Sequence, residues 1–210
     1  MNDNFCVFLD AGHGGIDPEG NYTTAGKRYQ HDSGEFHSGG WFYEGVFNRR
    51  LMSAVMEKLD RLGILYIKVY HDYLDFPLEY RVNQANWYYR NFKRGIFVSA
   101  HANASGVNAR GFEIYTSPGV TTSDRIANYM WQNVEDLLGN RIRMRTDLSD
   151  GDYDKEARFY VLTRTLMPAI LIEHLFFDNL QDAELLMDEE IVDRFAEAQV
   201  RAIIQYGNSI

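Results

Sequence analysis

Near its start, the sequence reads Phe5-Cys6-Val7-Phe8-Leu9-Asp10-Ala11-Gly12-His13-Gly14-Gly15. A short run of bulky apolar residues that glycines close at once predicts a buried strand running into a tight turn. The glycines let the backbone approach a bound group closely, and His13 is presented at the carboxyl end of the strand. Open α/β sheets carry their ligand sites at that edge. A lone turn histidine often has no task, so the rest of the sequence must decide what His13 does.

Composition sets the class of protein. The chain has 210 residues, of which 45% are hydrophobic and 14% aromatic, and this fits one domain over residues 1–210. A net charge of −9 argues against nucleic acid as a partner. No apolar stretch is long enough to span a membrane, and the single Cys6 excludes an intrachain disulfide. The first residues lack a secretory signal, so we expect a mature or trimmed form, or export by another route.

Strands and helices alternate along the chain. Strands are expected at residues 5–11, 64–70, 95–100, 111–116 and 168–173, with a further short strand at 159–163. Helices are expected at residues 44–62, 78–92, 122–138 and 181–206, the last one broken near Asp188. This order predicts an α/β fold in which a mostly parallel, twisted sheet is flanked by helices on both faces.

A long insertion separates the first strand from the first helix. Residues 16–43 show no sustained period, and their aromatic side chains favour a packed lid over a loose tail. His31 and His37 lie in this stretch and are expected at its solvated rim. Of the two, His37 is the better candidate for contact with a substrate.

Four chemically active side chains stand at the ends of predicted elements. Buried strands lead into His13, His101 and Glu173, and a helix begins at Glu44. If the strands are parallel, these groups converge on one edge of the sheet. Two imidazoles and one carboxylate with an open fourth position form a common catalytic zinc site, and the remaining carboxylate can act as a base.

At these positions the sequence resembles the zinc-dependent N-acetylmuramoyl-L-alanine amidases of the third amidase family. The matching motifs are residues 9–15, Glu44 with Asn48, residues 99–104, residues 111–113, and residues 168–173 with Phe177 and Asn179. The resemblance implies that His13, Glu44 and His101 hold one zinc ion per chain. It also implies that Glu173 is the catalytic acid and base, and that the substrate is peptidoglycan or a muropeptide. Arg81 fits an arginine of the family with either a structural or a functional role.

The chain departs from the family pattern at several positions. Ala11 replaces a usual proline, the second strand ends in Tyr70-His71-Asp72, and the insertion is long. Asn103, His37, Glu113 and His174 are candidates for substrate contact. Glu113 is equally well explained as an orienting group or a solvent-facing strand residue, and His174 as a packed residue or part of the site lining. The acidic stretch 147–156 is expected to be a solvated loop, because its spacing does not match a calcium-binding loop.

Two other functions remain open from the sequence. A zinc carboxypeptidase acting on wall peptides would use similar ligands, and a non-catalytic wall-binding module could keep the same fold. We expect a monomer that acts in the periplasm or cell wall, either in bacterial wall remodelling or as a phage endolysin.

Overall fold

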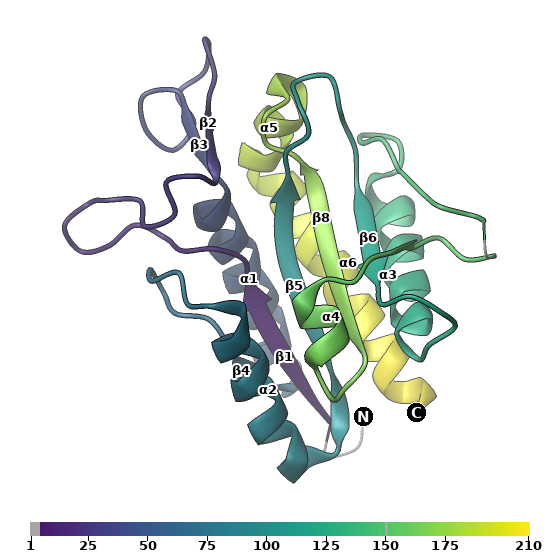
Figure 1. Ribbon diagram of the computed structural model, residues 1–210. Helices are drawn as coiled ribbons and strands as arrows, with labels where there is room; N and C mark the ends of the chain where they lie inside the picture. Colours follow the sequence, from purple (N-terminus) through teal and green to yellow (C-terminus); the bar gives the residue numbers. More distant parts are fainter. Residues whose placement is uncertain (1–4, 150) are drawn as a thin grey trace.

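The computed structural model describes residues 5–149 and 151–210 (Figure 1). Its main sheet has six strands in the order β4-β1-β5-β8-β6-β7. β1 (Phe5–Ala11), β4 (Leu65–Lys68), β5 (Arg94–Asn103) and β8 (Ala169–Phe176) are parallel. β6 (Glu113–Thr116) runs antiparallel to β8, and β7 (Lys155–Glu156) is parallel to β6. The predicted mostly parallel sheet is therefore confirmed.

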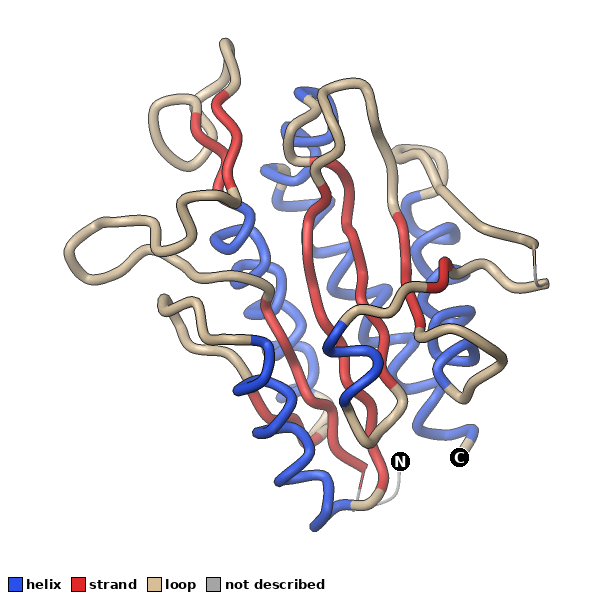
Figure 2. The backbone as a smooth tube through the Cα atoms, in the orientation of Figure 1, coloured by secondary structure: helices blue, strands red, loops and turns tan. Residues whose placement is uncertain are grey.

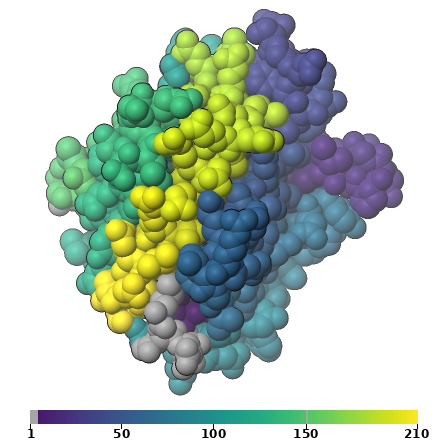
Figure 3. All heavy atoms as spheres, turned by 180° about the vertical axis from the view of Figure 1, so that it is seen from behind, coloured from purple at the N-terminus to yellow at the C-terminus, as the bar shows by residue number. Residues whose placement is uncertain are grey.

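Helices cover both faces of this sheet. α1 (Glu44–Arg61), α3 (Ser123–Leu138) and α6 (Glu189–Ser209) lie on one face, which is turned toward the reader in Figure 3. α2 (Leu78–Phe92) and the short α4 (Tyr160–Arg164) lie on the other face, and α5 (Leu180–Met187) follows β8. No helix in the described ranges is long and apolar enough to cross a membrane.

The buried strands explain why two cores form. Side chains of a strand alternate between the two faces of a sheet. In β1, Leu9 joins the large core under α1, α3 and α6, whereas Phe8 joins the smaller core under α2 and α4. All seven residues of β1 are buried, as its continuous apolar run predicts.

One predicted strand is wrong. Residues 159–163 were expected to be extended, but residues 160–164 form helix α4, in which the Thr163 amide donates to the Phe159 carbonyl. Val161 and Leu162 pack into the smaller core. The neighbouring β8 already pairs with β5 and β6, so no edge is free beside it for another strand.

The insertion is more ordered than its sequence indicates. β2 (Arg28–Gln30) and β3 (Trp41–Tyr43) form an antiparallel hairpin that stands beyond the carboxyl edge of the main sheet (Figure 2). Phe42 is fully buried, and its ring stacks on Phe177 at a centroid distance of 5.8 Å. This contact fixes the hairpin to the end of β8, so the insertion forms a packed wall.

Candidate active site

Strand register brings three of the candidate side chains into one row. In the backbone pairing, His101 of β5 lies opposite Glu173 of β8, which lies opposite Glu113 of β6. Residues directly opposite each other in a sheet project from the same face. The row lies near the carboxyl end of the parallel strands, which is the edge expected from the sequence.

His13 and Glu44 reach the same place from the glycine turn and from the start of α1. The ligand atoms of His13, Glu44 and His101 all lie within 4.8 Å of one another. Glu44 Oε1 is 2.9 Å from His101 Nδ1 and 3.3 Å from His13 Nε2. The three side chains predicted from the sequence as metal ligands are thus close together in space.

Burial and mutual contact shape the charge of this cluster. Burial opposes ionisation of Glu44, but hydrogen bonds from His101 and His13 lower its pKa to about 2. Burial also opposes protonation of His101, yet the Glu44 carboxylate outweighs it and raises the pKa of His101. The site therefore holds an ionised carboxylate between two imidazoles.

Glu173 lies beside this cluster in a different environment. Burial raises its pKa to about 8, with His101 acting against the shift and with Glu44 and Glu113 adding to it. Its Oε2 atom is buried and has no hydrogen-bond partner among the described residues. A buried carboxylate oxygen without a hydrogen bond is costly unless a ligand or another group satisfies it.

The turn that carries His13 is held by two arginines. His13 has a φ of 64°, a left-handed conformation that side chains other than glycine seldom adopt. Arg81 Nη2 and Arg49 Nη2 both donate to the His13 carbonyl, at 3.0 and 2.7 Å. Arg81 also donates to Asp10 Oδ1 at 2.5 Å and is 1% exposed, so it acts as a buried anchor for the turn.

Close packing explains two glycines of the site. A Cβ atom on Gly12 would lie 2.1 Å from Cε1 of His101, so only glycine leaves room for that ring. A Cβ atom on Gly45 would lie 1.7 Å from the Gly14 carbonyl oxygen. The glycine turn and the start of α1 are therefore in backbone contact, which brings Glu44 to His13.

Glu113 is buried and accepts hydrogen bonds from several side chains. Its Oε1 accepts from Arg145 and from Lys155, the latter at 2.6 Å, and its Oε2 accepts from Asn103 Nδ2 at 3.0 Å. The Glu113 side chain is 2% exposed. Of the two alternatives left open by the sequence, the solvent-facing residue is wrong because Glu113 is buried, whereas an orienting role and substrate contact stay predictions. Asn103 remains half-buried at the site, where substrate contact stays a prediction.

His174 does not line the site. Its side chain projects from the opposite face of β8, where it is fully buried among aromatic rings of α1 and α6. Its Nδ1 lies 3.0 Å from the His101 carbonyl oxygen, and its Nε2 lies 3.0 Å from Gln199 Nε2. The expectation of substrate contact is corrected: His174 supports the backbone of β5 behind His101.

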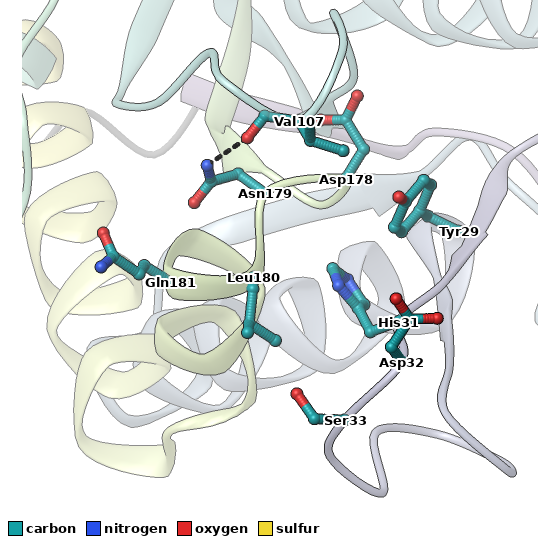
Figure 4. Close-up of a pocket in the computed structure, with 9 residues that line it drawn as sticks. All are labelled: Tyr29, His31, Asp32, Ser33, Val107, Asp178, Asn179, Leu180 and Gln181. Carbon is teal, nitrogen blue, oxygen red and sulfur yellow. Dashed lines mark hydrogen bonds between the residues drawn. The ribbon is translucent and has the colours of Figure 1, made fainter.

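The two histidines of the insertion serve its packing. His37 Nδ1 accepts from the Tyr43 amide at 2.9 Å, and the His37 ring stacks on the Tyr43 ring. Substrate contact by His37 stays a prediction. His31 is buried, contrary to the expected solvated rim, and its Nε2 lies 2.9 Å from the Phe177 carbonyl oxygen. In Figure 4 its ring lines a pocket of about 370 Å³ between the insertion and the start of α5.

Sequence reasoning missed the support beneath the site. Arg49 and Ser99 were not singled out, although Ser99 Oγ donates to Asp10 Oδ2 at 2.7 Å and so shares that carboxylate with Arg81. The available signal was Asp10 itself, a charged residue inside an otherwise apolar strand. Such a residue needs a buried cationic partner.

Comparisons with known proteins agree with this arrangement. A model of the family described as N-acetylmuramoyl-L-alanine amidase matches residues 7–205. The uncharacterized protein YqiI of Bacillus subtilis is 30% identical over 202 residues, covering 95% of this chain and 84% of YqiI. The amidase LytC of the same organism is 28% identical over 95% of this chain, which spans only 35% of LytC.

A solved amidase structure is also similar to this chain in its three-dimensional fold. The catalytic domain of CwlV, an N-acetylmuramoyl-L-alanine amidase from Bacillus (Paenibacillus) polymyxa var. colistinus, superposes with a TM-score of 0.70. The two sequences are 26% identical, and the match covers 97% of this chain and 98% of that domain.

Proposed function

The chain belongs to the N-acetylmuramoyl-L-alanine amidase family of peptidoglycan hydrolases, and from this we propose that it is a zinc enzyme. Its reaction is hydrolysis of the amide that joins the lactyl group of N-acetylmuramic acid to L-alanine of the stem peptide. His13, Glu44 and His101 would hold one zinc ion, and Glu173 would be the catalytic acid and base. The observation that carries the proposal is the convergence of these four groups at one edge of the sheet.

The donor set fits zinc. Two imidazole nitrogens and one carboxylate oxygen suit zinc better than magnesium or calcium, which prefer oxygen ligands alone. Bonds of 2.0–2.1 Å in a tetrahedral site place ligand atoms about 3.3 Å apart. The 3.3 Å between Glu44 Oε1 and His13 Nε2 has this value, and the 2.9 Å to His101 is close to it. When bound, zinc polarises a carbonyl and makes a water molecule more acidic.

Side chains around the proposed metal site would have different roles in the reaction. The low pKa of Glu44 keeps it ionised, so it can balance a metal charge at neutral pH. Glu173, with an unpartnered oxygen and a raised pKa, is suited to take a proton from water and return it to the leaving amine. Glu113 and its cationic partners hold the neighbouring strand in place. The Arg81 and Arg49 bonds fix the direction of His13.

The test is a pair of substitutions. Glu173→Gln keeps the shape of the side chain but cannot accept a proton, so hydrolysis should fall by about two to four orders of magnitude with unchanged zinc content. His13→Ala should lose zinc and activity together. The measurements are elemental analysis and release of new alanine amines from purified muropeptides, which also separates an amidase from a carboxypeptidase.

A matched control is available on α5. Glu184 is exposed, and Glu184→Gln should leave both zinc content and turnover at the level of the unmodified protein. If Glu173→Gln retains more than about a third of the turnover, the catalytic role belongs to another residue. Less than about a tenth of an equivalent of zinc in the unmodified protein would contradict the metal assignment.

We also propose that the insertion forms one wall of the substrate groove. Its hairpin is fixed to the end of β8 by the contact between Phe42 and Phe177, and a pocket lies between the insertion and the start of α5. Replacing residues 32–39 with a two-residue Asn-Gly turn keeps the β2–β3 hairpin. The variant should stay folded and bind zinc, with a changed KM for muropeptides. Unchanged kinetics on every muropeptide tested would contradict the groove wall.

A further inference from the structure

A second group of carboxylates lies away from the catalytic cluster. It consists of Asp124 in the first turn of α3, and Asp152 and Asp154 in the loop before β7. One carboxylate oxygen from each residue lies within 4.8 Å of the other two. The expectation that this loop is merely solvated is wrong at Asp154, which is 2% exposed.

Asp154 is the key member of this acidic cluster. Its Oδ2 accepts from the Thr116 hydroxyl at 2.6 Å, whereas its Oδ1 is buried and no N–H or O–H group of the described residues donates to it. Burial raises the pKa of Asp154 to about 7. The Thr116 bond opposes this shift, whereas the charge of Asp152, hydrogen bonding between the two carboxyl groups and the charge of Asp124 add to it. An unpartnered buried carboxylate oxygen beside two further carboxylates indicates a missing positive group.

In the part of the chain that the structure describes, no lysine or arginine supplies that charge to Asp124 or Asp154. Within the described residues, neither Asp124 nor Asp154 makes an ion pair with a lysine or arginine, and the neighbouring Lys155 is paired with Glu113. From the described residues, Asp124 accepts neutral hydrogen bonds from the Thr121 amide at 2.6 Å and from the Thr121 hydroxyl at 2.8 Å. Each carboxylate oxygen can accept more than one bond, so these contacts leave room for a ligand.

We propose that Asp124, Asp152 and Asp154 bind a hard divalent cation of the calcium class. The donors are all carboxylate oxygens, the type that calcium and magnesium prefer over zinc. Oxygens bound to one calcium ion at 2.3–2.6 Å are at most about 5 Å apart, and the observed spacing satisfies this limit. The site is independent of the proposed amidase reaction.

The cation would join two parts of the fold. Asp124 belongs to α3, whereas Asp154 directly precedes β7 at the edge of the sheet. Lys155, the first residue of β7, pairs with Glu113, which lies opposite Glu173 in the sheet. Binding would therefore fix the loop next to the strand that supports the catalytic row.

Terbium provides a direct probe because it takes the same oxygen ligands as calcium. The ring of Tyr153 stacks on Trp131 at a centroid distance of 4.0 Å, so these chromophores lie within the cluster's own loop and helix. In the zinc-loaded full chain, excitation of the tryptophan should produce terbium emission that saturates at one equivalent and is displaced by calcium. Calcium at a hundredfold excess over its Kd should raise Tm by at least about 5 °C.

Substitutions separate this site from other acidic groups. Asp154→Asn keeps the shape and the Thr116 contact, and should weaken terbium binding at least about tenfold and abolish the calcium-dependent shift in Tm. Asp136→Asn, an exposed change at the far end of α3, should leave both unchanged. Emission that does not saturate, or that is equal in Asp154→Asn, would overturn the proposal. A Tm that changes with pH but not with calcium would also overturn the proposal, because the carboxylates would then share a proton.

Discussion

Replacing Arg81 with methionine should destabilise the protein and disturb the metal ligands together. The Arg81 guanidinium is 1% exposed and donates to Phe76 O, Asp10 Oδ1, Ala11 O, His13 O and Asp75 Oδ1. Methionine fills most of the volume but makes none of these bonds. The Asp10 carboxylate, itself 1% exposed, would keep only its bond from Ser99.

The expected cost follows from the buried charge that is left behind. Removing one partner of a buried ion pair costs about 3–5 kcal/mol. For a chain of this size, that corresponds to a fall in Tm of about 6–20 °C. Zinc content should fall as well, because the left-handed His13 backbone loses one of the two arginines that hold its carbonyl.

Urea unfolding of zinc-free protein measures the free energy change, and a double variant tests its cause. Adding Asp10→Asn to Arg81→Met removes the unpaired charge, so it should restore at least about 1 kcal/mol of the loss. Arg61→Met removes an exposed i,i+4 pair with Glu57 and should cost less than about 0.5 kcal/mol. A double variant no more stable than Arg81→Met would refute the reasoning.

Three further outcomes are expected. Gly12→Ala should fold but lose most of its zinc, as elemental analysis can show, because the new Cβ would lie 2.1 Å from the His101 ring. Phe42→Ala should cost about 3–5 kcal/mol in urea unfolding, since this fully buried ring anchors the insertion. Burial lowers the pKa of His174 to about 3. Between about pH 6.5 and pH 3 the unfolded chain therefore binds one more proton at this residue than the folded chain does. The free energy of unfolding falls as the pH drops through this window. In zinc-free His174→Gln, the dependence of the free energy of unfolding on pH should lose the contribution of His174, which is up to about 1.4 kcal/mol per pH unit. An unchanged dependence would mean that another residue binds this proton.

Much of the fold was predictable because its strands and helices are strongly patterned. β1 is a continuous apolar run closed by glycines, and α2 begins and ends at the predicted residues. Residues 159–163 misled the prediction because aromatic and β-branched side chains favour strands in general. Packing of Val161 and Leu162 under the sheet decided in favour of a helix, and such tertiary contacts have no local signature.

The candidate site was predictable to the same extent. His13 lies just after β1, and His101 and Glu173 lie near the carboxyl ends of β5 and β8, so the parallel topology brings them to one edge. The far-face position of His174 was open to prediction, because successive residues of a strand point to opposite faces and His174 follows Glu173. The hydrogen bonds of Glu113 depend on side chains distant in sequence, including Arg145. Asp154 was misread for a similar reason, because its burial requires Thr116 and Asp124 from other elements.

The central place of β8 sets when the candidate site can assemble during synthesis. β8 is inserted between β5 and β6, yet among the described residues it is the strand that comes latest in the sequence. Until residue 176 has left the ribosome, β5 presents an unpaired edge and Glu173 has no neighbours in the row. A nascent or prematurely terminated chain therefore lacks the assembled row of His101, Glu173 and Glu113. The candidate site can therefore assemble only after β8 has been synthesised, later than the strands that flank it.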